Sequence, residues 1–229
     1  MLFHELTIVG VLKKDIEFKN MNEELSKIIN KAFLNDEKLK EFHELNTFKL
    51  YVFSGFQPIE INGYKKGNMY SFKLRSMDRV FALNMRHHIK NTENDLLDIV
   101  TIGFESISYR PINELYTLTP CISVIENRKH WINSDYEIDL IKDRINSNIQ
   151  RKYKMWFGEE IDKNHDFIDS IEQKNNSVIV LNYKEGKLLT NKFKITIKKD
   201  EISQRLAFLI LGTGLLEKNS LGLGFCTAR

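Results

Sequence analysis

The chain has 229 residues, of which 42% are hydrophobic and 28% charged, and its formal net charge is +3 at pH 7. That length suffices for one large or two small globular domains, and the composition excludes a disordered or fibrous protein. No apolar run approaches the roughly 20 residues that a membrane span needs, and the N-terminus lacks the basic and apolar regions of a signal peptide. We therefore expect a cytoplasmic protein without a membrane segment.

In the first half of the chain, apolar residues recur with periods of two and of three to four, which indicate strands and helices. The expected elements are a strand at 2–12, a helix from about residue 20 that resumes after a polar break and runs to 45, strands at 47–53, 59–61 and 68–74, a helix at 77–89 and a strand at 99–109. We expect 59–61 and 68–74 to pair as a hairpin. With that hairpin counted as the third strand and 99–109 as the fourth, the order is βαββαβ, the ferredoxin-like arrangement.

The second half repeats the same order. We expect a strand at 115–125, a helix at 135–157, strands at 178–182 and 192–197, a helix at 202–211 and a last strand at 221–227, while residues 158–173 show no clear pattern. Gly158 follows the long helix at the position typical of a C-cap. The predicted fold class is α+β, with two tandem ferredoxin-like domains at 1–110 and 111–229.

Glycines are concentrated near the end of the chain, in Gly212-Thr213-Gly214 and Gly222-Leu223-Gly224. We call residues 212–225 the glycine-rich segment. It lacks the Gly-Lys-Ser/Thr of a P-loop, and it is too close to the end of the chain for a dinucleotide-binding unit. One interpretation is a loop whose backbone N–H groups hold an anion; the other is a tight turn that packs a last strand against a helix.

This ending, in which a helix runs into paired Gly-x-Gly and then Gly-hydrophobic-Gly-Phe, resembles the signature of the RAMP superfamily. It is most similar to the CRISPR repeat-processing endoribonucleases. The resemblance implies two ferredoxin-like folds and a CRISPR precursor RNA as substrate, cut within its repeats. It also implies a product with a 2′,3′-cyclic phosphate and a 5′-hydroxyl.

A second resemblance lies in residues 41–54. The family has a histidine near the end of its first helix, then a lysine and a strand ending in Phe-Ser, and these correspond to His43, Lys49 and Phe53-Ser54. Histidine can accept or donate a proton near neutral pH, and a lysine can stabilise charge on phosphorus. Some members add a tyrosine about fifteen positions before the histidine; here Ile28 stands there, and Tyr51 is the substitute we expect. Which group is the acid and which the base stays open.

The sequence predicts no metal and no cofactor. Cys121 and Cys226 lack zinc-ligand spacing and are expected to be buried reduced thiols, although a disulfide between them is compatible with the sequence. His87 and His88 are adjacent on an expected helix and point in different directions, so they are not a metal pair. With Arg86 and Lys90 beside them, a basic face that contacts RNA is one interpretation, and an ordinary solvated surface is the one we favour.

RNA contacts are expected to be mainly electrostatic, through basic residues and the glycine-rich segment. The candidates are Lys73, Arg75, Lys142, Arg144, Arg151, Lys152, Gly212, Gly214, Lys218, Gly222 and Gly224. Two other functions fit the sequence: a non-catalytic RAMP subunit that binds RNA in a CRISPR effector complex, and a ferredoxin-like protein unrelated to nucleic acid.

Overall fold

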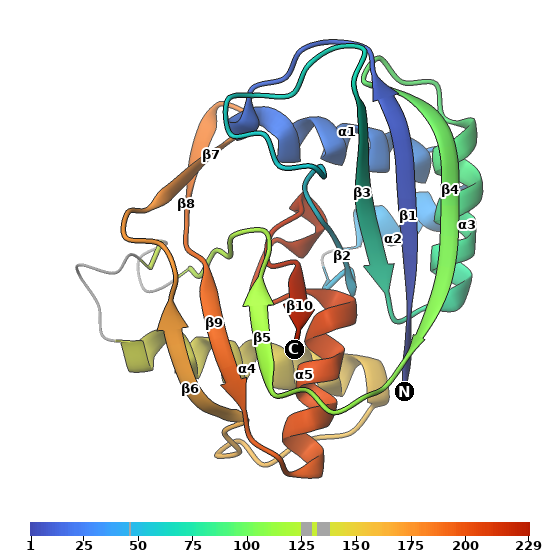
Figure 1. Cartoon of the computed structure of the whole chain (residues 1–229). Helices are drawn as coiled ribbons and strands as arrows, with labels where there is room; N and C mark the ends of the chain where they lie inside the picture. Colours follow the sequence, from blue (N-terminus) through green and yellow to red (C-terminus); the bar gives the residue numbers. More distant parts are fainter. Residues whose placement is uncertain (46, 125–129, 132–137) are drawn as a thin grey trace.

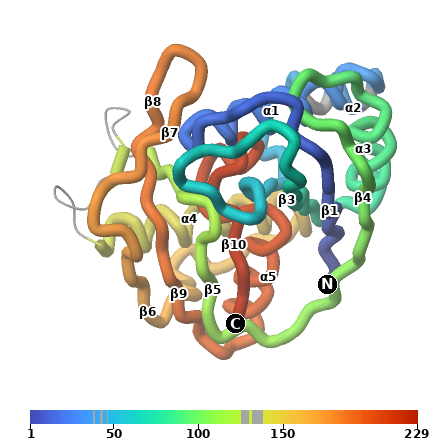
Figure 2. Tube along the Cα trace, turned by 45° about the horizontal axis from the view of Figure 1, so that its top comes forward, coloured from blue at the N-terminus to red at the C-terminus, as the bar shows by residue number. Residues whose placement is uncertain are grey.

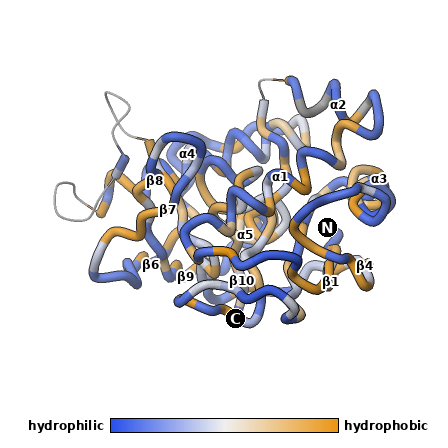
Figure 3. The backbone as a smooth tube through the Cα atoms, turned by 90° about the horizontal axis from the view of Figure 1, so that it is seen from above, coloured by the Kyte–Doolittle hydropathy of each residue, from blue (hydrophilic) through white to orange (hydrophobic). Residues whose placement is uncertain are grey.

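The computed structural model describes residues 1–229 except 46, 125–129 and 132–137, and for residues 38, 42 and 43 it describes the backbone alone. Two antiparallel sheets stand side by side, with the helices behind them (Figure 1). Seen from above, β1, β4, β9 and β10 lie on one side of the molecule and α1, α2 and α4 on the other (Figure 3). None of the helices in the described ranges is long and apolar enough to cross a membrane.

The N-terminal sheet has the strand order β2-β3-β1-β4. With two helical crossovers, this order is the ferredoxin-like βαββαβ fold. Its elements are β1 (Leu2–Leu12), α1 (Met21–Phe33), α2 (Glu37–Glu44), β2 (Tyr51–Phe53), β3 (Met69–Ser76), α3 (Arg79–Asn91) and β4 (Leu97–Ser108). Two helices begin at capping aspartates, since Asp36 accepts from the Leu39 amide and Asp78 from the amides of Val80 and Phe81.

The C-terminal sheet has the order β10-β5-β9-β6, the same fold again. Its elements are β5 (Glu114–Thr117), α4 (Ile138–Phe157), β6 (Ile168–Gln173), β9 (Phe193–Ile197), α5 (Glu201–Thr213) and β10 (Cys226–Ala228). A separate hairpin of β7 (Ile179–Tyr183) and β8 (Gly186–Thr190) extends from this half, beside the start of α1 (Figure 2). The predicted α+β class with two tandem ferredoxin-like folds is confirmed.

Two predicted strands are wrong, and one strand, β6, was not predicted. Residues 178–182 do not form the second strand of the C-terminal sheet; that strand is β6, and 178–182 falls largely in the β7–β8 hairpin. Residues 59–61 lie outside any strand, in irregular backbone that leads into a turn, and β3 pairs with β2 instead. β6 gives little sequence signal because only one of its faces is buried, and that face carries few apolar residues, Ile168 and Ile171 among them.

The two halves share a packed junction. Phe3 and Met77, from the N-terminal half, belong to the hydrophobic core of the C-terminal half. The rings of Phe3 and Phe208 lie 5.2 Å apart. Gly212 of α5 permits this approach, since a Cβ there would lie 2.6 Å from the Met77 sulfur. The junction places α5 and the glycine-rich segment against the N-terminal sheet.

Candidate active site

The α2–β2 linker, residues 47–50, carries one of the two predicted catalytic groups. The side chain of His43 lies outside the described part of the chain; its backbone is in the last turn of α2. Lys49 lies just after that helix, and its Nζ donates to the Leu45 carbonyl at 2.5 Å. Partial burial lowers the pKa of Lys49, so its ammonium is a stronger acid than that of an exposed lysine.

Tyr51 does not fit the role predicted for it. The strand begins only at this residue, and Leu50 has a φ of 48°, so the alternation that would place Tyr51 beside Lys49 is broken. Tyr51 is 1% exposed, its ring packs against Phe33 and Phe81, and burial raises the pKa of its hydroxyl, which bonds to Ser220. It is a core residue that cannot exchange protons with an RNA on the surface.

The linker lies against α4 of the other half. The Arg151 guanidinium lies 5.0 Å from the centre of the Phe48 ring, and the Lys152 Nζ lies 5.9 Å from it. Thr47 Oγ1 is 3.5 Å from the Met155 sulfur. Both halves of the molecule therefore meet at the segment that contains Lys49.

Lys152 was predicted to bind RNA, but it is 1% exposed. Its Nζ donates to the carbonyl oxygens of Gly214 and Leu216, at 2.7 and 2.9 Å, and to Asn219 Oδ1 at 2.7 Å. Burial lowers its pKa to about 7. Lys152 therefore holds the glycine-rich segment from inside and is not available to a phosphate.

The glycine-rich segment is built as a buried turn. Gly214, Gly222 and Gly224 have φ values of 85°, 76° and 72°, which favour glycine. Their amides donate within the protein, to the carbonyls of Ile210, Asn219 and Pro120 in that order. The N-terminal half holds the segment as well, because Asn22 Nδ2 donates to Leu221 and Gly222.

The prediction that Gly212, Gly214, Gly222 and Gly224 bind RNA is therefore not supported by their geometry. All four are buried, and Gly212 lies within α5. The residue that this segment presents to solvent is Lys218, which is exposed and left-handed at φ 56°. Lys218 stays a predicted RNA contact.

Arg75 is a second predicted RNA contact that the fold buries. It is 7% exposed and lies between the rings of Phe3 and Phe225, at 5.0 and 4.2 Å. Its Nε donates to Glu5 at 2.6 Å and its guanidinium to the Cys226 carbonyl at 2.7 Å. Arg75 joins the two halves instead of facing a ligand.

Other predicted contacts are at the surface, but most already have an acceptor. Lys73 Nζ lies 2.5 Å from Glu5 Oε1, Lys142 Nζ lies 2.9 Å from Asp166 Oδ2, and Arg144 donates to the Val124 carbonyl. Arg151 is exposed on α4. The basic residues that the sequence grouped together thus have different environments.

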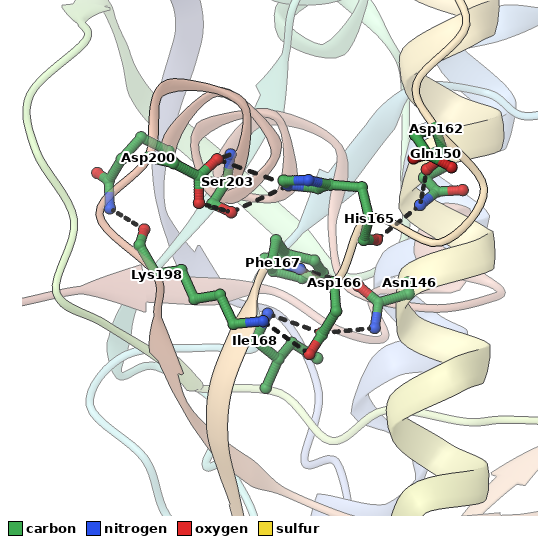
Figure 4. Close-up of polar contacts among 11 residues, drawn as sticks. Asn146, Gln150, Asp162, His165, Asp166, Phe167, Ile168, Lys198, Asp200 and Ser203 are labelled. Atoms are coloured by element: carbon green, nitrogen blue, oxygen red, sulfur yellow. Dashed lines mark hydrogen bonds and ion pairs between the residues drawn. The ribbon is translucent and has the colours of Figure 1, made fainter.

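A polar cluster behind the C-terminal sheet was not predicted, because its members are scattered along the chain (Figure 4). The Asp166 carboxylate accepts hydrogen bonds from Asn146 and Lys198. Burial alone would raise the pKa of Asp166, but these bonds and the one from Lys142 hold that pKa below its ordinary value. His165 Nε2 lies 3.1 Å from Ser203 Oγ. The cluster fastens the loop after α4 to the start of α5.

Figure 4 also shows why His165, Ser203 and Asp200 are not a nucleophilic triad. Ser203 donates to Asp200 at 2.6 Å, so the serine hydrogen points to the aspartate and not to the histidine. The same aspartate caps α5 through the Ser203 amide. Among the described residues, no group of three or more histidine, cysteine or acidic side chains is placed to hold a metal ion. Cys121 and Cys226 are buried free thiols.

Comparison with known proteins places this arrangement in a family. The model of the family "CRISPR associated protein Cas6, C-terminal" matches residues 110–228, more than half of the chain. The chain belongs to the Cas6 family. The resemblance noted in the glycine-rich segment is thereby confirmed, although its glycines are buried and shape the turn.

Three similar proteins each match along 93% or more of this chain. A curated protein of Methanocaldococcus jannaschii, the CRISPR-associated endoribonuclease Cas6 2, is 26% identical over 93% of this chain and 94% of its own length. A solved structure of a Cas6-related protein from Pyrococcus furiosus has a TM-score of 0.73 at 20% identity, covering 99% of this chain and 98% of its own. A RAMP protein described as binding different RNA substrates has a TM-score of 0.71 at 17% identity, with full coverage of both chains.

Proposed function

We propose that this protein is an endoribonuclease that cuts CRISPR precursor RNA within its repeats. The observation that carries the proposal is the match along 93% of the chain to a CRISPR-associated endoribonuclease of the Cas6 family. The docking of the Lys49 linker on α4 adds support, since it brings a basic segment of each half to one place.

The proposed reaction needs no water as a reactant. The ribose 2′-oxygen attacks the adjacent phosphorus, the bond from phosphorus to the 5′-oxygen breaks, and a 2′,3′-cyclic phosphate and a 5′-hydroxyl result. One proton leaves the 2′-hydroxyl and one is delivered to the 5′-oxygen. We assign the imidazole of His43 to proton transfer, and the ammonium of Lys49 to stabilising the charge on phosphorus.

The lowered pKa of Lys49 also suits it to donate a proton to the 5′-oxygen, because a stronger acid transfers its proton more readily. In this scheme His43 accepts the proton of the 2′-hydroxyl. Tyr51 has no part in it, because it is buried. The groups proposed act without a metal, so we expect cleavage to persist in excess EDTA.

Replacement of His43 tests the proposal. We expect His43→Ala to lower the single-turnover cleavage rate of a repeat RNA by at least about 10²-fold, the lower end of the range for general acid–base catalysis, while affinity for the RNA stays within about threefold. Cleavage is followed by denaturing gel, and the 2′,3′-cyclic end is identified by its resistance to phosphatase until acid opens it.

His87→Ala is the matched control, since His87 is an exposed histidine on α3 of the same half. It should cut at the wild-type rate. A repeat with a 2′-deoxy sugar at the cut site should bind and stay intact. If the wild type binds both RNAs and cuts neither, the non-catalytic RNA-binding function replaces this proposal, and a strict requirement for Mg²⁺ overturns the mechanism.

A further inference from the structure

Helix α4 carries five basic residues between positions 142 and 154, and the structure separates them by their partners. Lys142 is paired with Asp166 and Lys154 with Glu160. Lys152 is buried under the glycine-rich segment, and Arg144 donates to a backbone carbonyl. Within the described ranges, Arg151 alone of the five has neither a carboxylate nor a carbonyl acceptor.

Arg151 is nevertheless held in place. Its guanidinium lies over Phe48, 5.0 Å from the ring centre, and Phe48 directly precedes Lys49 in the linker. Stacking on a ring occupies the flat face of a guanidinium and leaves its N–H edge free. That edge is rigid and carries several donors, which suit the paired oxygens of a phosphate.

We propose that Arg151 is a catalytic residue that binds the non-bridging oxygens of the scissile phosphate. The inference rests on the proposed function, because it requires the cut to occur beside the linker. The C-terminal half then contributes a cation to the reaction carried out by His43 and Lys49 of the N-terminal half. Phe48 positions that cation, and the same contact keeps the linker on α4.

The expected effect is electrostatic and larger in the transition state than in the bound RNA. Negative charge on the phosphate oxygens increases when the 2′-oxygen adds, so a fixed guanidinium beside them lowers the barrier. Loss of one such group typically costs about 10²- to 10³-fold in rate. Loss of one phosphate contact among several changes affinity much less.

The experiment compares Arg151→Gln and Arg151→Lys with the wild type in the full chain. The single-turnover cleavage rate is measured at saturating protein, and the affinity is measured on a repeat RNA carrying a 2′-deoxy sugar at the cut. For Arg151→Gln we expect a rate about 10²-fold lower and an affinity within about fivefold of wild type. Arg151→Lys keeps the positive charge but lacks the planar set of N–H donors, and its cleavage rate should be about tenfold lower than that of the wild type.

Lys154→Gln is the matched control, since Lys154 is an exposed cation one turn further along α4 and is already paired with Glu160. It should leave both rate and affinity within about threefold, as expected for an exposed ion pair. The inference is overturned if Arg151→Gln cuts at the wild-type rate, if it weakens binding without slowing cleavage, or if Lys154→Gln slows cleavage equally.

A sulfur-substituted RNA separates contact with the phosphate from an indirect effect through Phe48. With one non-bridging oxygen replaced by sulfur, the wild type should be slowed with one of the two stereoisomers, and Arg151→Gln should show no such difference. An unchanged stereochemical preference in Arg151→Gln would reduce Arg151 to a structural role. If the wild type cuts no repeat at all, the proposed function fails, whereas a normal wild type with a normal Arg151→Gln removes only this inference.

Discussion

At the scale of single residues, the buried amino group of Lys152 joins α4 to the glycine-rich segment at three points. Its three hydrogen bonds to Gly214, Leu216 and Asn219 use every proton of the ammonium form. The residue before it, Arg151, faces out onto Phe48. Adjacent residues of one helix thus support the glycine-rich segment and the linker, because their side chains leave α4 in different directions.

The burial of Lys152 makes the stability of the fold depend on pH. Its pKa is lowered to about 7 in the folded protein, whereas an unfolded lysine has a pKa near 10.4. Between these values the unfolded chain binds more protons than the folded one, so the contribution of Lys152 to the free energy of unfolding rises with pH from about 7 to about 10.

Lys152→Met, which has no titrating group, serves as the comparison. We expect it to be less stable than the wild type by about 2–4 kcal/mol at pH 9, since the neutral amine of Lys152 still donates two hydrogen bonds that methionine cannot make. The difference should shrink towards pH 6.5, as measured by urea unfolding across the range. A difference that is constant with pH, or that grows as the pH falls, contradicts the assignment.

At the scale of elements, the glycine-rich segment acts through its shape. It leads from α5 to β10 with five residues at positive φ, namely Gly214, Leu216, Lys218, Gly222 and Gly224. Its carbonyls accept hydrogen bonds from Lys152 and Asn22. Gly224 is its most constrained point, because a Cβ there would overlap the Leu215 carbonyl oxygen. The segment supports the neighbouring strand β2, where Ser220 bonds to Tyr51.

Gly224→Ala should therefore destabilise the protein strongly. We expect a loss of at least about 3 kcal/mol from backbone strain and the overlap together. Gly67→Ala is the matched control, because Gly67 has a φ of 84° but nothing within 4 Å of an added Cβ. Gly67→Ala should lower the free energy of unfolding by about 1 kcal/mol, the cost of placing alanine at a positive φ without any steric overlap. Equal losses in the two variants, measured by urea unfolding, would show that the tight contact at Gly224 is unimportant.

At the scale of the whole molecule, the buried Arg75, which is paired with Glu5, joins the two halves. Glu5 and Arg75 lie on adjacent strands of the N-terminal sheet, and Arg75 reaches the backbone of α5 and β10 at Leu211 and Cys226. Burial lowers the pKa of Arg75, an effect that Glu5 opposes. The hydrogen bonds of Arg75 to Glu5, Leu211 and Cys226 therefore help to fix how the two halves sit relative to each other.

Arg75→Met should lower the free energy of unfolding by about 3–5 kcal/mol, because it leaves the Glu5 carboxylate without its buried partner. Adding Glu5→Gln should recover part of that loss, since the buried carboxylate would otherwise keep only the partly exposed Lys73 as its cation. Affinity of the folded protein for repeat RNA should stay within about threefold. Losses that simply add, or RNA affinity that falls tenfold in a folded Arg75→Met, would contradict this role.

Much of this arrangement could be predicted from the sequence. The periods of apolar residues indicated the doubled βαββαβ order. The paired glycines carried the family's ending but left open whether they form an anion-binding loop or a tight terminal turn. These features depend on neighbours within a few positions, through local backbone conformation and the alternation of faces. The weak strand β6 was missed for the same reason, as its pairing with β9 depends on a distant partner.

Only the tertiary structure decided which cations face solvent. Lys152 finds its three acceptors 62 to 67 positions away, and Arg75 finds carbonyls 136 and 151 positions away. From the sequence alone, Lys152 and Arg75 cannot be told apart from Arg151, because each is a basic residue close to another basic residue. Whether a charged side chain is buried depends on which acceptors the fold brings around it, and no local sequence pattern encodes that. The sequence could therefore name the candidate cations. It could not distinguish those that support the fold from those that can bind a phosphate.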